Sequence, residues 1–220
     1  MSEADWRECG DPEELLKSVW DRVSERKARL FACACCRSIW NLLADWGRAD
    51  LEAVERMADG ALDPAEFKSA GWLIQDQDTP AEYAVHHADD SGVRHPEVLA
   101  GAAHWAREAF ARPAGETVGY DDEDTGDPYL RLDEMARQAN LVRDLVTFCP
   151  VAFDPACRTD TAVAVARQLY ESREFGAMPI LADALQDGGC EDEQVLNHCR
   201  DANLVHVRGC WVCDLVLGKE

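Results

Sequence analysis

The segment "SERKARLFACACCRSIWNLLADW", residues 24–46, decides the fold class because its apolar residues repeat with the period of an α-helix. One face contains Phe31, Cys35, Ile39, Leu42 and Trp46, and further apolar residues widen it to most of the circumference: Leu30, Cys33, Cys36, Trp40 and Leu43. A helix that is apolar on most sides is buried on more than one side. We therefore predict a long central helix from about Glu25 to Trp46.

Helical patterns continue on both sides of this segment. Asp11 followed by Pro12 is a favourable helix start, and a break is expected near Ser24. Turns rich in glycine and proline separate the remaining helical patterns. No segment shows a convincing two-residue alternation, although "CWVCDLVLG", residues 210–218, fits a strand by composition. The sequence therefore predicts an all-α fold of about nine helices.

The predicted helices fit a single compact domain over residues 1–220, with the N- and C-terminal helices packed together. Residues 1–60 and 131–220 form its frame, and residues 61–130 form an acidic middle. A loop is expected at about 113–128, where glycine and acidic residues interrupt the helical pattern.

The charge of the chain is strongly acidic, with 22 basic and 43 acidic residues and a net charge of −21. Residues 61–130 alone carry 15 acidic and 4 basic residues. Phosphate groups need neutralising cations, so we predict no direct binding to nucleic acid or to anionic membranes. An acidic surface instead favours a protein partner with basic residues.

The cysteines are numerous, ten in 220 residues. No apolar run is long enough to span a membrane, and the N-terminus lacks the layout of a secretion signal. We therefore expect a cytoplasmic protein, in which thiols are reduced and disulfides are rare. Most of the cysteines should be small buried hydrophobic residues, unless some of them bind a metal.

The densest group of metal-ligating residue types lies in "LNHCRDANLVHVRGCWVCDL", residues 196–215. Zinc prefers four nitrogen or sulfur ligands in a tetrahedron. The spacing of His206, Cys210 and Cys213 would place them on one face of a helix. The predicted zinc ligands are Cys190, Cys199, His206 and Cys210, with Cys213 and His198 as substitutes.

A packing role for the same residues is the alternative, because their spacing matches no standard zinc framework. Cys199 would lie on the apolar face of its helix. His198 and His206 would then satisfy buried carbonyl groups or cap helix ends. Trp211 would fill space in the core, with one partner for its indole N–H. The sequence leaves both interpretations open.

Two further groups are weaker candidates. Cys33 and Cys36 have the spacing of a redox dithiol, but they lie in the middle of an apolar helix, where burial raises a thiol pKa. Glu82 and His86 are spaced for a metal site on one helix, without a second such pair to complete it. Other histidines and acids of that region are His87, His95, His104, Asp89 and Asp90. The sequence predicts no catalytic residues and no cofactor besides zinc.

Four motifs resemble those of an uncharacterised, many-copy family of bacterial proteins: "ERKARLFACACCRSIW", "ANLVRDL", "MPILADALQDGGCEDEQVLNHCR" and "HVRGCWVCDLVLGKE". The resemblance covers roughly residues 1–46 and 132–220 and implies a variable middle. It implies no activity, because none is known for the family. The chain departs from the family pattern at Cys213, where an aliphatic residue is usual, and at "NLV" before His206, where a Gly-Pro turn is usual.

The function expected from the sequence is a non-enzymatic protein–protein interaction module that recognises its partner through residues 61–130. One alternative is a structural or regulatory zinc-binding protein that uses the C-terminal Cys/His group. A second is an acidic inhibitor that mimics DNA, suggested by the net charge alone.

Overall fold

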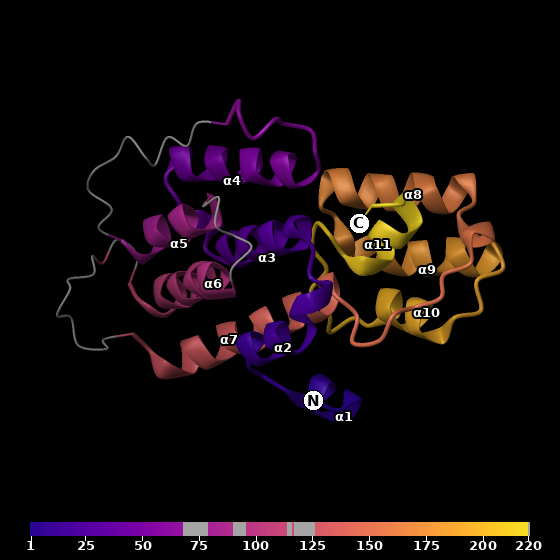
Figure 1. Cartoon of the computed structure of the whole chain (residues 1–220), viewed down its shortest axis with the longest axis horizontal. Helices are drawn as coiled ribbons and strands as arrows, with labels where there is room; N and C mark the ends of the chain where they lie inside the picture. The colour runs from indigo at the N-terminus through magenta and orange to yellow at the C-terminus, as the bar shows by residue number, and fades with distance from the viewer. Residues whose placement is uncertain (68–78, 90–95, 114–115, 117–125, 220) are drawn as a thin grey trace. The chain divides into compact units, whose positions relative to one another are not determined.

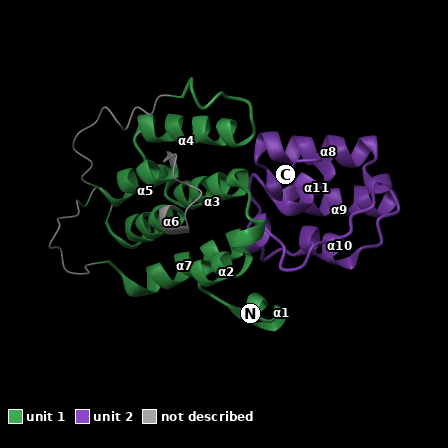
Figure 2. Cartoon of the chain, viewed as in Figure 1, with its two compact units in different colours: residues 1–142 green, residues 143–220 purple. Residues whose placement is uncertain are grey.

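The computed structural model describes all of the chain except residues 68–78, 90–95, 114–115, 117–125 and 220 (Figure 1). The described part contains eleven α-helices and no strand, which confirms the all-α class and exceeds the nine helices predicted. It divides into two compact units, residues 1–142 and residues 143–220 (Figure 2). No helix of the described part is long and apolar enough to cross a membrane.

The first unit is built from α1 to α6 and most of α7. Their bounds are α1 Glu3–Glu8, α2 Pro12–Val19, α3 Glu25–Ser38, α4 Asp45–Ala58, α5 Pro80–Asp89, α6 Pro96–Ala111 and α7 Pro128–Leu145. The side chain of Asp11 accepts the first free N–H groups of α2, and Ser24 does the same for α3. The predicted helix start at Asp11 and the break near Ser24 are therefore confirmed.

Helix α3 is central in this unit, as its all-round apolar pattern predicts. It packs against α4, α5 and α6. Its buried residues lie on every side: Ala28, Leu30, Phe31, Ala32, Cys33, Ala34, Cys35 and Cys36.

The predicted extension of α3 to Trp46 is wrong, because the helix ends at Ser38 and Trp46 belongs to α4. The Ser38 hydroxyl donates to the carbonyl oxygen of Cys35 at 2.7 Å, a local bond that competes with the helical ladder. A single 3₁₀ turn, Trp40–Leu42, follows. Arg48 from α4 then donates to the carbonyl of Trp40 at 3.2 Å and so satisfies one of the freed acceptors.

An ion pair between α3 and α4 is expected to contribute strongly to the stability of this unit. Arg37 donates from Nε and Nη2 to the two carboxylate oxygens of Glu55 at 2.6 and 2.8 Å, and the Glu55 side chain is only 2% exposed. Arg37→Met would remove the guanidinium from that buried carboxylate, so we expect a loss of about 3 kcal/mol in the free energy of unfolding, measured in urea. A double variant with Glu55→Gln should recover part of this loss.

The second unit contains α8 Asp160–Ser172, α9 Met178–Asp187, α10 Glu193–Arg200 and α11 Trp211–Leu217, together with the last residues of α7. Helix α9 packs against α8 and α10, and α11 packs against the same two helices. Residues 211–217 are therefore helical, and the strand that composition allowed for residues 210–218 is not formed. The core of this unit includes Leu169, Leu181, Leu185, Val195, Val212 and Val216.

Most of the predicted loop at about 113–128 lies outside the described residues. The predicted helices on either side of residues 90–95 are present as α5 and α6. The predicted packing of the terminal helices against each other stays a prediction.

Candidate metal site

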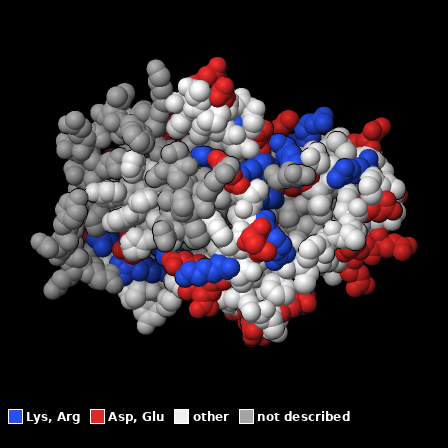
Figure 3. Space-filling view, viewed as in Figure 1, with Lys and Arg blue, Asp and Glu red and all other residues white. Residues whose placement is uncertain are grey.

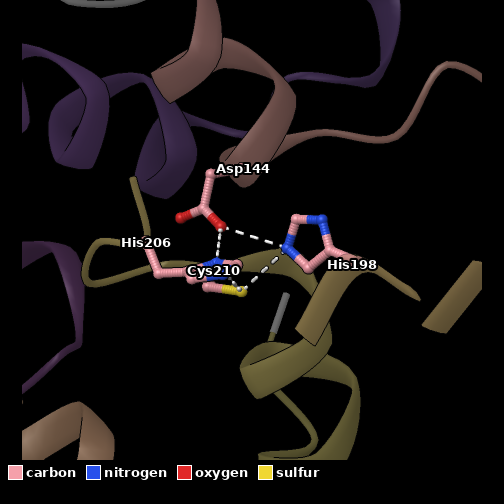
Figure 4. Close-up of side chains that lie close together, drawn as sticks. All are labelled: Asp144, His198, His206 and Cys210. Atoms are coloured by element: carbon pink, nitrogen blue, oxygen red, sulfur yellow. Dashed lines mark hydrogen bonds and ion pairs between the residues drawn. The ribbon is translucent and has the colours of Figure 1, made fainter. Parts of the chain in front are cut away.

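Four side chains of metal-ligating types converge within the second unit: Asp144, His198, His206 and Cys210 (Figure 4). One ligand atom from each lies within 4.8 Å of all the others. Within the described part of the chain, this is the one group of three or more such residues with that geometry. Asp144 and Cys210 are fully buried, and the side chains of His198 and His206 are 8% and 6% exposed.

Asp144 stands in the last turn of α7 and is the centre of the hydrogen bonds in the cluster. Its Oδ1 lies 3.1 Å from Nε2 of His198 and 2.7 Å from Nδ1 of His206. Its Oδ2 accepts the backbone N–H of Val207 at 2.8 Å. A negative charge at the C-terminal end of a helix is opposed by the helix dipole. These three contacts stabilise the buried carboxylate against the helix dipole and against the loss of its hydration.

His198 is positioned by α10, which begins after the capping side chain of Asp192. Val195 and Cys199 on the same helix are buried in the core, so the ring of His198 is held at the edge of the buried face. Its Nε2 lies 3.3 Å from Sγ of Cys210 as well as near Asp144. Its Nδ1 accepts the indole N–H of Trp211 at 3.1 Å.

His206 and Cys210 approach each other across a turn. The backbone N–H of Cys210 donates to the carbonyl of Val207 at 2.9 Å, and Gly209 has a φ of 92°, a conformation that favours glycine. Nδ1 of His206 lies 3.9 Å from Sγ of Cys210. The prediction that both residues lie on one helix face is wrong, because α11 begins only at Trp211.

The outer nitrogen of His206 has a different environment. Nε2 is buried and has no hydrogen-bond partner among the described residues. His206 also belongs to the wall of a pocket of about 410 Å³, together with Cys199, Arg173 and Leu204. The ring therefore belongs both to the cluster and to the wall of this pocket.

The charges of the cluster stabilise one another. Burial raises the pKa of Asp144, but hydrogen bonds and charge interactions with His198 and His206 together outweigh burial and lower that pKa from 3.8 to about 2. Burial lowers the pKa of His206, but its hydrogen bonds and charge interactions with Asp144 and Cys210 together outweigh burial and raise that pKa from 6.5 to about 10. Burial raises the pKa of the Cys210 thiol well above its usual 9.0. A metal ion would be needed to deprotonate this sulfur at neutral pH.

The spacing of these atoms fits a tetrahedral zinc ion. Metal–ligand bonds of about 2.0–2.3 Å imply separations of roughly 3.3 Å between nitrogen and oxygen ligands and 3.6 Å between nitrogen and sulfur ligands. The nitrogen–oxygen distances here are 2.7 and 3.1 Å, and the nitrogen–sulfur distances are 3.3 and 3.9 Å. For these four pairs, binding requires changes in separation of about half an ångström.

The structure brings together two of the four ligands predicted from the sequence, His206 and Cys210, and adds the predicted substitute His198. The other candidates lie outside the cluster. Cys190 and Cys199 are buried among the core residues of the second unit, and Sγ of Cys213 lies 3.7 Å from Sδ of Met178. Asp144 was not predicted, and its only sequence signal is an acidic residue in the last turn of a helix.

The weaker candidates do not form comparable groups among the described residues. Burial raises the pKa of Cys33 well above 9.0, as expected for a thiol in the middle of α3, which does not favour a redox role. The carboxylate of Glu82 accepts the backbone N–H and hydroxyl of Thr79, at the start of α5. Asp90 and His95 lie outside the described residues.

The comparisons with known proteins do not add to this geometry. No family model, no curated protein and no solved structure matches the chain. The resemblance to the many-copy bacterial family stays a prediction.

Proposed function

We propose that this chain is a zinc-binding protein in which Asp144, His198, His206 and Cys210 hold one ion. The observation that carries the proposal is the convergence of four ligand atoms of three chemical types in a buried position. Zinc accepts nitrogen, sulfur and carboxylate oxygen in a tetrahedron. Magnesium and calcium prefer sites made entirely of oxygen, so they fit this set poorly.

The role of the ion in this proposal is structural or regulatory. Catalytic zinc sites keep one position open for water, whereas four protein ligands close the coordination sphere. The ligands come from the end of α7, from α10 and from the segment that precedes α11. An ion bound to all of them would fix these parts of the second unit to one another and would add its binding energy to the stability of the fold.

A catalytic cysteine is a less suitable explanation of the same residues. In a nucleophile–histidine–acid triad, one ring nitrogen contacts the nucleophile and the other contacts the acid. Here Nε2 of His198 faces both Cys210 and Asp144, and Nδ1 is occupied by Trp211. Cys210 is also fully buried, so a substrate would not reach its sulfur.

The test is the metal content of the protein. We expect protein purified without added metal or chelator to contain one zinc per chain by elemental analysis. After removal of the ion, added zinc should raise the free energy of unfolding by about 4 kcal/mol when free zinc is a thousand times its Kd. Absence of zinc from the purified protein, together with no stabilisation on adding it, would rule out the proposal.

The other two interpretations keep the support they had from the sequence. Recognition of a protein partner through residues 61–130 rests on the charge of that region, much of which lies outside the described residues. A DNA mimic needs an uninterrupted row of carboxylates. On the face visible in Figure 3, Lys and Arg atoms lie among Asp and Glu atoms of the described residues, which does not favour that role.

A further inference from the structure

The hydrogen bond of Trp211 determines where His198 carries its proton. An indole N–H is only a donor, so Nδ1 of His198, 3.1 Å away, must accept with a lone pair. Cys210 and Asp144 raise the pKa of His198 from 6.5 to about 9 despite burial, but a protonated ring would set an N–H on Nδ1 against the indole N–H. The contact is therefore made by the neutral ring, whose single N–H lies on Nε2. That N–H points at Oδ1 of Asp144, at 3.1 Å, and passes near Sγ of Cys210, at 3.3 Å.

This arrangement suits the metal-free cluster and conflicts with the metal-bound one. A metal on Nε2 needs the lone pair of that nitrogen, which moves the proton of the neutral ring to Nδ1. Two N–H groups would then face each other across 3.1 Å, with no acceptor between them. Histidines that bind metals normally donate this second N–H to a carboxylate, a carbonyl or water. The residue in that position here is a donor.

Because of the surroundings of Trp211, relief of this conflict would affect the packing of α11. Its side chain is 7% exposed, and its ring lies 4.7 Å from that of His198, centroid to centroid. It is the first residue of α11 and directly follows the ligand Cys210. A displaced indole would therefore change the packing at the start of a helix that contacts α8 and α10.

We infer that Trp211 is a metal-responsive gate: its N–H stabilises the empty site, and binding of zinc displaces it. The inference rests on the proposed function and adds regulation to it. The second unit then has two states. In one, hydrogen bonds hold the four side chains of the cluster together, and in the other, the ion does. A protein with such a site senses zinc, because part of the binding energy is used to move Trp211.

The opposite role for Trp211 predicts the opposite effect of its removal. If the indole merely supported His198 as a ligand, Trp211→Phe would weaken zinc binding by about 10- to 100-fold, as loss of an outer-shell partner usually does. If the indole opposes the bound state, the same variant removes the opposing N–H. It should then bind zinc about tenfold more tightly, because zinc binding no longer leaves a buried indole N–H without an acceptor.

The experiment compares the zinc affinity of the metal-free wild-type chain with those of Trp211→Phe and Trp40→Phe, by competition with a chromophoric chelator at one pH. Trp40 lies in the first unit, between α3 and α4, so its variant should bind zinc like the wild type. We expect tighter binding by Trp211→Phe alone. Equal or weaker binding by Trp211→Phe, while the wild type binds one zinc, would overturn the gate and leave the zinc site intact.

A measurement on the wild-type chain covers the case in which Trp211→Phe does not fold. Long-range ¹H–¹⁵N spectra distinguish the two ring nitrogens of His198. They should show the proton on Nε2 without metal and on Nδ1 with zinc, with a shift of the Trp211 indole N–H. An indole resonance that keeps its hydrogen-bonded position in the zinc-bound protein would contradict the gate. Absence of any zinc binding by the wild type would instead remove the proposed function, and the gate with it.

Discussion

A Cys210→Ala variant is expected to bind zinc about a thousandfold more weakly than the wild-type chain, because loss of an outer-shell partner already costs 10- to 100-fold and a direct ligand contributes more. Cys210 is the only sulfur of the cluster, and its thiolate would supply one of the two negative charges that face the ion. Alanine is preferred to serine because a hydroxyl oxygen could still occupy the ligand position. Competition with a chelator at neutral pH measures the difference.

Two matched cysteine variants give this experiment its controls. Cys149 is an exposed thiol of the same unit, so Cys149→Ala should change neither zinc affinity nor stability. Cys199 is buried in the core beside the cluster, so Cys199→Ala should lower stability while zinc affinity is retained. If Cys199→Ala weakened zinc binding as strongly as Cys210→Ala, the ligand set predicted from the sequence would be the correct one, and the group around Asp144 would not.

The fold was predictable where the periodicity of the sequence was strong. The apolar residues around the whole of α3 indicated its central place, because a surface helix is apolar on one face only. The end of α3 was not predictable, since the next apolar residues keep helical spacing and the helix ends through local and tertiary bonds of Ser38 and Arg48. Helix α1 was missed although Ser2 and Asp5 form a capping box, because that helix has only six residues.

The candidate site was predictable only in part, for a reason of sequence distance. His206 and Cys210 are four residues apart, so a turn of almost any kind brings them close. Asp144 is 54 residues from His198 and 62 from His206, and only the packing of the unit brings it to them. His198 and Cys199 are adjacent in sequence, but successive residues on a helix point about 100° apart. One therefore reaches the cluster and the other the core.

The metal-free protein is expected to become less stable as the pH rises from about 6.5. The folded state binds the proton of His206 more tightly than the unfolded chain does, because Asp144 and Cys210 together raise that pKa from 6.5 to about 10 despite burial. The resulting stabilisation is complete below pH 6.5 and is lost as the pH rises towards 10. At about 1.4 kcal/mol per pKa unit, the whole loss is on the order of 5 kcal/mol.

At low pH, stability changes with pH in the opposite direction. The folded pKa of Asp144 is lowered from 3.8 to about 2, so its stabilisation is present above pH 3.8 and is lost as the pH falls through 2. Stability from these two groups should therefore be greatest between about pH 4 and 6.5. Thiols ionise near pH 9.0 in the unfolded chain, so the range from 6.5 to 8.5 isolates His206 from Cys210.

Urea unfolding of the chelator-treated protein across this range measures the effect. His206→Gln should make the decline shallower by the share of His206, since the pKa of His198 is raised as well, whereas His104→Gln, in the first unit, should not make it shallower. A wild-type stability that is constant from pH 6.5 to 8.5, or an undiminished decline in His206→Gln, would contradict the assignment. Zinc should reverse the trend, because the ion binds only deprotonated rings and its affinity rises with pH. The same proton that stabilises the empty site competes with the metal for it.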